Sequence, residues 1–170
     1  MDGARLRILV VDDYVDAADS TVELLSMWGY DAVACYNGAT ALESVCLHRP
    51  DAVVLELFMP RMNGFQFTGL FRELPGCGTI PIIAVSGYFS QAYRSKCSEV
   101  GIQRYLLKPA DPEYLKDVLI RTIATTAVQY SRNSDTANGF ALKMRRRKKR
   151  ILHGMVSQPF STPMVRIWPG

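Results

Sequence analysis

The chain has few of the residues that metal and redox sites use, and none of them at a suitable spacing. Its cysteines form no CxxC pair and no Cys/His ligand pattern, which argues against a zinc site and against a disulfide framework. They are Cys35, Cys46, Cys77 and Cys97, and we expect them to be buried free thiols. Neither histidine has an acid or a cysteine at a useful spacing. No pairing of a nucleophile with a base indicates hydrolase chemistry, so the chain is not expected to be an enzyme.

Long apolar runs and phosphate-binding loops are also missing. The N-terminal segment MDGARLRILVVDD has a short apolar run that ends in two acids, which is typical of neither a signal peptide nor a membrane span. We therefore expect a cytoplasmic protein. The absence of GxxxxGK and GxGxxG loops disfavours a nucleotide site. At 170 residues and 48% hydrophobic, the chain is long enough for one well-buried core and too short for two ordinary domains.

Charge divides the chain into two unlike parts. Residues 1–127 hold 11 Lys/Arg and 15 Asp/Glu, a net charge of −4, whereas residues 128–170 hold 9 and 1, a net charge of +8. At the same boundary, periodic apolar segments give way to the irregular polar tract SRNSDTANG and then to a basic run. We predict one domain over residues 1–127 and a basic, irregular, flexible C-terminal extension over residues 128–170.

Apolar runs and helical patterns alternate five times in the first part. The predicted strands read RILVV, AVACY, AVVLEL, PIIAVSG and RYLL, and each is followed by a segment with one apolar stripe at helical spacing. Strands that are apolar on both faces are typical of a parallel sheet covered by helices on both sides. The pattern therefore predicts a doubly wound α/β fold.

Polar side chains follow four of the predicted strands, where ligands bind in open sheets of this kind. They are Asp12, Asp13, Glu56, Ser86 and Lys108. We expect three carboxylates, a hydroxyl and an ammonium to converge on one crevice. The aspartates could instead cap the following helix, and without a metal Lys108 is expected to pair with Glu56 or with one of the aspartates.

Four motifs in these places carry a resemblance to a known family. The motifs VVDD, LELFMPRMNG, AVSGY and YLLKP occur in this order, each at a strand end. Over about residues 5–125 they resemble the CheY-like receiver domain of bacterial two-component response regulators. The resemblance implies a flavodoxin-like five-stranded sheet of order 2-1-3-4-5. It also implies a role in phosphorelay signal transduction, with a histidine kinase or a downstream effector as the partner.

The resemblance also assigns roles to individual residues. On the metal side, Mg²⁺ would be held by Asp12, Asp13, the residue at position 56 and Phe58. On the phosphoryl side, the resemblance assigns the switch and phosphate-binding positions to Ser86, Gly87, Tyr105 and Lys108. Gly87 would leave room for the phosphoryl group, Tyr105 would be the switch aromatic, and the bond from Lys108 to Pro109 would be cis.

The sequence departs from the family at the phosphoacceptor, where Glu56 stands in place of aspartate. Phosphoryl transfer depends on positioning, and a displacement near 1 Å can cost on the order of 10²-fold in rate. The longer side chain also reaches toward the place of the phosphoryl oxygens, where it could accept charge-assisted hydrogen bonds from Lys108 and Ser86. We predict a pseudo-receiver that is phosphorylation-independent or a partial mimic of the phosphorylated state, with Mg²⁺ binding weakened or absent.

Two other functions stay open. One is a phosphorylatable receiver that accepts a phosphoryl group from a histidine kinase on Glu56 or on a neighbouring acid. The other is a nucleic-acid-binding regulator acting through the run KMRRRKKR, with the receiver as a dimerising scaffold and the face around Tyr105 as the candidate dimer contact. The cationic residues of the run are Lys143, Arg145, Arg146, Arg147, Lys148, Lys149 and Arg150.

Several features limit what the tail can do. Binding of the basic run to phosphates would weaken steeply with salt and would carry no sequence specificity. No helix-turn-helix or zinc-finger pattern fits into the tail. After the run, apolar residues alternate with prolines as far as Trp168, a pattern typical of a short docking peptide. A solvated tail with no fixed partner is the alternative.

Overall fold

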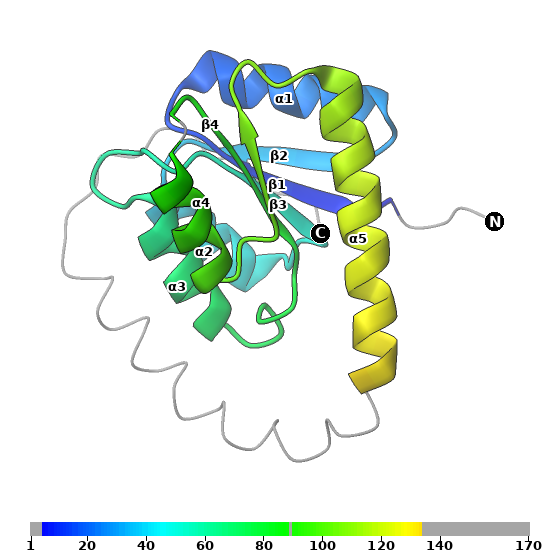
Figure 1. Ribbon diagram of the computed structural model, residues 1–170. Helices are drawn as coiled ribbons and strands as arrows, with labels where there is room; N and C mark the ends of the chain where they lie inside the picture. The colour runs from blue at the N-terminus through cyan, green and yellow to red at the C-terminus, as the bar shows by residue number, and fades with distance from the viewer. Residues whose placement is uncertain (1–4, 89, 134–170) are drawn as a thin grey trace.

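The computed structural model describes residues 5–88 and 90–133, with side chains described up to residue 126. Five strands alternate with five helices in this part of the chain (Figure 1). The strands are β1 (Arg7–Val11), β2 (Asp31–Cys35), β3 (Ala52–Leu55), β4 (Ile82–Ser86) and β5 (Arg104–Leu107). The helices are α1 (Val15–Met27), α2 (Gly38–Leu47), α3 (Gly64–Glu73), α4 (Gln91–Glu99) and α5 (Pro112–Asn133).

The strands form one parallel sheet of order β2-β1-β3-β4-β5. This confirms the predicted flavodoxin-like, doubly wound fold and its strand order. Successive residues of a strand point to opposite faces of the sheet, so each central strand contributes to two apolar cores. Leu9, Val53 and Ile82 pack on the α2 and α3 side, whereas Ile8 and Ile83 pack on the α1 and α5 side. Because helices cover both faces, the buried residues of β1, β3 and β4 are apolar on both sides of the sheet, apart from Ser86 at the end of β4.

Gly64 allows α3 to begin directly against the segment that follows β3. A Cβ atom at this position would lie 2.8 Å from the carbonyl oxygen of Glu56 and from Cα of Leu57. The Gly64 amide donates to the Leu57 carbonyl at 2.8 Å. The helix start is stabilised by a capping box, in which Asn63 and Gln66 each accept a hydrogen bond from the other's backbone amide. Glycine is therefore required here for close backbone contact.

The ends of two elements differ from the sequence prediction. The third strand ends at Leu55, so Glu56 and Leu57 lie just beyond it rather than inside it. Helix α5 continues to Asn133, six residues past the boundary predicted at residue 127. The polar residues Ser131 to Asn133, predicted to be irregular, are therefore helical. No proline or glycine interrupts the chain between residues 113 and 133, which allows the helix to continue.

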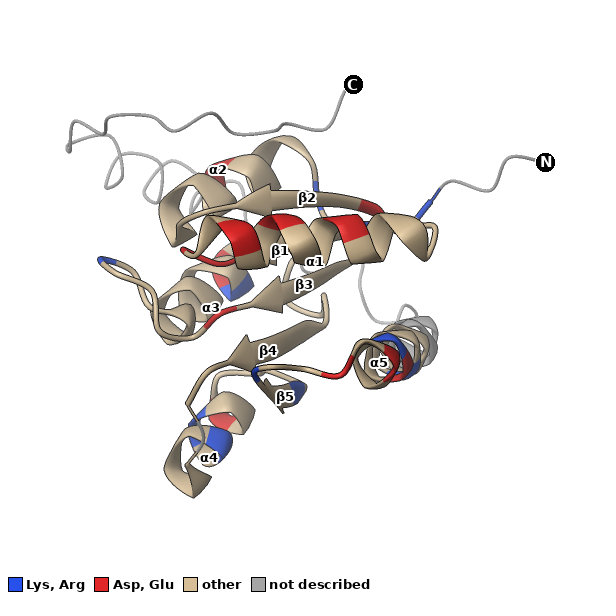
Figure 2. Cartoon of the chain, turned by 90° about the horizontal axis from the view of Figure 1, so that it is seen from above, with Lys and Arg blue, Asp and Glu red and all other residues tan. Residues whose placement is uncertain are grey.

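The remaining predictions from the sequence concern the cysteines, a membrane span and the C-terminal tail. All four cysteines are free, and Cys35, Cys77 and Cys97 are buried, but Cys46 is exposed on α2, contrary to the prediction. In the described part of the chain, no helix is long and apolar enough to cross a bilayer. Figure 2 shows acidic residues along α1 and basic residues on α4. The basic run of residues 143–150 and the rest of the tail from residue 134 lie outside the described residues.

Candidate functional site

Four of the five predicted polar side chains meet at the carboxyl ends of the strands. The register aligns Val11 with Leu55 across β1 and β3, and Ser86 with Leu107 across β4 and β5. The strands end at the same edge of the sheet, where Asp12, Glu56 and Lys108 directly follow β1, β3 and β5 and Ser86 is the last residue of β4. We call the cluster of Asp12, Glu56, Ser86 and Lys108 the Glu56 site.

The Glu56 carboxylate is buried, with 8% of the residue exposed, and it accepts hydrogen bonds from several donors. Its Oε1 atom accepts from Ser86 Oγ at 2.5 Å, from the Leu57 amide at 2.7 Å and from the Phe58 amide at 3.0 Å. Its Oε2 atom lies 2.9 Å from Lys108 Nζ. A buried carboxylate with this many donors is held in one orientation.

The ammonium group of Lys108 joins two carboxylates. Its Nζ atom lies 2.5 Å from Asp12 Oδ2 as well as 2.9 Å from Glu56 Oε2. The other oxygen of Asp12 accepts from the Tyr14 amide at 3.0 Å, at the entry to α1. The predicted pairing of Lys108 is confirmed for both partners, and Asp12 also binds the backbone ahead of the helix.

Both members of the Glu56–Lys108 pair are charged at neutral pH. Burial by itself would raise the pKa of Glu56, but hydrogen bonds from Ser86, from the Phe58 amide and from Lys108 outweigh it and hold the pKa below its usual value. Burial by itself would lower the pKa of Lys108, but its contacts with Asp12 and Glu56 outweigh burial and raise the pKa. The site is thus an ion pair with satisfied hydrogen bonds.

The predicted metal ligands differ in their burial and in their contacts. Asp13 is exposed, and within the described residues no three His, Cys, Asp or Glu side chains gather closely enough to hold a metal ion. The Phe58 amide donates a hydrogen bond to Glu56. The Phe58 ring packs edge-on against the Tyr93 ring, with the ring centroids 5.0 Å apart. Magnesium needs near-octahedral oxygen ligands at about 2.0–2.1 Å. Receiver domains bind this ion in the active site, and here two of the acids, Asp12 and Glu56, hold the Lys108 ammonium.

The two other predicted switch residues lie beside the site. Gly87 is exposed, and a Cβ atom there would meet no atom within 4 Å, so open space borders Ser86 on this side. Tyr105 is half-buried against the core, and its hydroxyl donates to the Tyr88 carbonyl. Burial raises the pKa of Tyr105. Tyr105 therefore links β5 to the loop that follows β4.

Two parts of the site were not predicted from the sequence. The amides of Leu57 and Phe58 bind the Glu56 carboxylate, and no side-chain type marks a backbone donor. An aromatic cluster also borders the site, with Tyr88 and Tyr93 at a centroid distance of 5.6 Å and Phe65 stacked on Tyr93 at 6.1 Å. The sequence shows these aromatic residues but not that they gather here.

Comparisons of the sequence and of the structure with known proteins give the same family. The family described as the response regulator receiver domain matches residues 8–120. The response regulator MprA of Mycobacterium tuberculosis is 32% identical over 139 residues, which cover 81% of this chain and 57% of MprA. The chain thus spans little more than half the length of this curated relative.

Two solved structures show the similarity in three dimensions. The chemotaxis protein CheY4 of Vibrio cholerae is 28% identical with a TM-score of 0.68, covering 70% of this chain and 99% of CheY4. The receiver domain of the sensor histidine kinase PA1611 from Pseudomonas aeruginosa, with a magnesium ion coordinated in its active-site cleft, is 28% identical. Its TM-score is 0.65, with 71% of this chain and 99% of that domain covered. Receiver domains are signalling modules rather than typical enzymes. The fold, the strand-end side chains and these matches agree, and the chain belongs to the receiver domain family of two-component response regulators.

Proposed function

We propose that this receiver signals without phosphorylation, because Glu56 already makes contacts that a phosphoryl group would make. The observation that carries the proposal is that one carboxylate binds both the Ser86 hydroxyl and the Lys108 ammonium. These are the groups that the family resemblance assigns to the phosphoryl oxygens. One carboxylate has less charge and fewer acceptor oxygens than a phosphoryl group, so the mimicry is partial.

The same contacts disfavour phosphoryl transfer to Glu56. An attacking carboxylate oxygen has to be aligned with the incoming phosphorus, and here Oε1 accepts from Ser86 and two amides while Oε2 faces Lys108. Attack would require breaking some of these hydrogen bonds inside a buried site. Phosphorylation by a histidine kinase is therefore proposed to be very weak or absent.

We propose that magnesium binding is weakened for a related reason. A divalent cation, such as the one in the cleft of the Pseudomonas receiver domain, would have to displace the Lys108 ammonium from Asp12 and Glu56. Lys108 already neutralises part of their charge. We therefore expect Asp12 and Glu56 to bind the Lys108 ammonium in preference to a magnesium ion.

The proposed output is a protein contact on the surface around Tyr105, with a downstream effector, a kinase or a second copy of the chain as the partner. Tyr105 lies between the Glu56 site and the loop after β4, so the state of the site can affect that surface. A cytoplasmic location and a polyanion contact by the basic run belong to the same proposal. Removing residues 134–170 would abolish the polyanion contact and its salt dependence.

Amide NMR spectra of two chains test the mimicry directly. The parent is compared with Glu56→Asp, before and after the variant is phosphorylated with acetyl phosphate. If Glu56 mimics the phosphorylated state, the resonances of Ser86, Tyr88 and Tyr105 in the parent resemble those of the phosphorylated variant. A parent spectrum that matches the unphosphorylated variant at these positions contradicts the proposal.

A further inference from the structure

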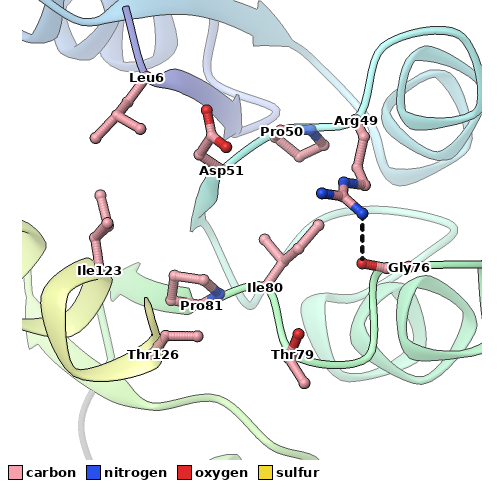
Figure 3. Close-up of a pocket in the computed structure, with 10 residues that line it drawn as sticks. All are labelled: Leu6, Arg49, Pro50, Asp51, Gly76, Thr79, Ile80, Pro81, Ile123 and Thr126. Carbon is pink, nitrogen blue, oxygen red and sulfur yellow. Dashed lines mark hydrogen bonds between the residues drawn. The ribbon is translucent and has the colours of Figure 1, made fainter. Parts of the chain in front are cut away.

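A cavity of about 240 Å³ lies at the opposite end of the sheet from the Glu56 site (Figure 3). It is bounded by residues that precede β1, β3 and β4 and by one face of α5. Pockets for small-molecule ligands usually measure about 300–1,000 Å³. This cavity is therefore better matched to one large side chain than to a whole ligand.

The lining of the cavity defines the side chain that it would accept. Leu6, Ile80 and Ile123 supply apolar surface around the opening, and Asp51 lies between Leu6 and Pro50 (Figure 3). Oδ2 of Asp51 accepts a hydrogen bond from the Arg7 amide at 2.8 Å, and a carboxylate can accept more than one donor. The complementary group is a large apolar ring with one N–H donor, which is the chemistry of an indole.

We propose that the occupant is the chain's own Trp168, carried by the proline-punctuated segment of residues 151–168. Thr126 of α5 lines the cavity, and α5 ends at Asn133, seven residues or about 10 Å further along the helix. The 35 residues from Asn133 to Trp168 can span about 115 Å when extended, so reach does not limit the contact.

Because Trp168 belongs to the same chain as the cavity, even a weak contact is enough for it to occupy the cavity. A tethered group acts at an effective concentration on the order of millimolar when the tether can span the distance. Tryptophan is also among the residues that contribute most to binding at buried contacts. Docking of Trp168 would hold the basic run of residues 143–150 between two fixed points. Tail contacts with a polyanion would then compete with docking. The inference does not depend on the role of Glu56.

Fluorescence of the full chain tests the contact. The chain has two tryptophans, and Trp28→Phe leaves Trp168 as the only reporter. We expect blue-shifted emission and acrylamide quenching several-fold slower than that of an exposed indole. In this background Thr126→Arg fills the mouth of the cavity and should restore fast quenching.

Thr125→Arg is the matched control. Thr125 and Thr126 each donate a hydroxyl to the carbonyl four residues earlier, at 2.8 and 2.9 Å, but Thr125 is exposed and does not line the cavity. The control should keep slow quenching, with the same thermal midpoint as Thr126→Arg. Equal, fast quenching in all three chains would overturn the proposal. Protection that is lost on dilution would also overturn it, because the occupant would then be the tail of a second copy.

A second measurement does not depend on the Thr126 variant. In the full chain, Trp168→Ala should shift the methyl resonances of Ile80 and Ile123, because the ring current of the indole is removed. Trp28 is present in both chains, so its ring current affects both spectra equally. Methyl resonances that do not move would overturn the placement of Trp168 in the cavity.

Discussion

Replacing Glu56 by glutamine tests the ion pair that defines the site. The substitution keeps the shape and removes the charge, so Lys108, whose side chain is 29% exposed, keeps only Asp12 as an anionic partner. The oxygen that accepts from Ser86 and two amides can be kept, but an uncharged oxygen accepts these bonds less strongly. The amide group would also place a second donor against the ammonium unless it rotates.

The expected loss of stability can be estimated from these contacts. Breaking a fully buried ion pair costs about 3–5 kcal/mol, and partial exposure of Lys108 together with its remaining contact to Asp12 reduces this to about 2 kcal/mol. At about 4 °C per kcal/mol for a domain of this size, the midpoint of thermal unfolding should fall by about 8 °C. The matched control is Glu43→Gln on the exposed face of α2, which should change the midpoint little.

The dependence on pH provides a second check. Because the folded pKa of Glu56 is lowered, its stabilising contribution is fully present above the unfolded value of about 4.3 and is lost as the pH falls through the folded pKa. The difference in stability between parent and Glu56→Gln should therefore be constant at neutral pH and shrink below about pH 4. Denaturant titrations over this range measure it. Equal stability at pH 7, or a difference that does not change in acid, would show that the Glu56–Lys108 ion pair does not stabilise the fold.

Three further predictions follow from neighbouring contacts. Ser86→Ala removes one hydroxyl donor to Glu56 and should cost about 1–2 kcal/mol in urea unfolding, and no measurable loss would exclude this hydrogen bond as a stabilising contact. Gly64→Ala should cost about 1–3 kcal/mol because its Cβ meets backbone at 2.8 Å. In the same helix Gly69→Ala, which meets no atom within 4 Å, should stabilise by about 0.5–1 kcal/mol, and similar effects at both positions would contradict the close contact. Lys108→Ala should increase affinity for Mg²⁺ in calorimetric titrations, and unchanged or weaker binding would show that the ammonium does not compete with the ion.

The position of the Glu56 site could be predicted because it depends on topology alone. Parallel strands that are apolar on both faces end at one edge of the sheet, so the residues after Val11, Leu55 and Leu107 had to lie near one another. The pairing of Lys108 with the acids followed from the cost of a buried charge without a partner.

Other features depend on contacts that residue types do not reveal. The donors from the Leu57 and Phe58 backbone are determined by how the chain turns after β3. Asp13 follows Asp12 directly, yet Asp12 is buried and contacts Lys108 whereas Asp13 is exposed, a difference that the residue type does not reveal. The cavity near Asp51 joins loops far apart in sequence, so no local pattern predicts it.

Intact-mass spectrometry after incubation with acetyl phosphate and magnesium shows whether Glu56 accepts a phosphoryl group. The parent chain is compared with Glu56→Asp under identical conditions. We predict that the variant alone gains the mass of one phosphoryl group, because Glu56 prevents transfer in the parent chain. Labelling of the parent to the same extent as the variant would contradict it and would show a working phosphoacceptor.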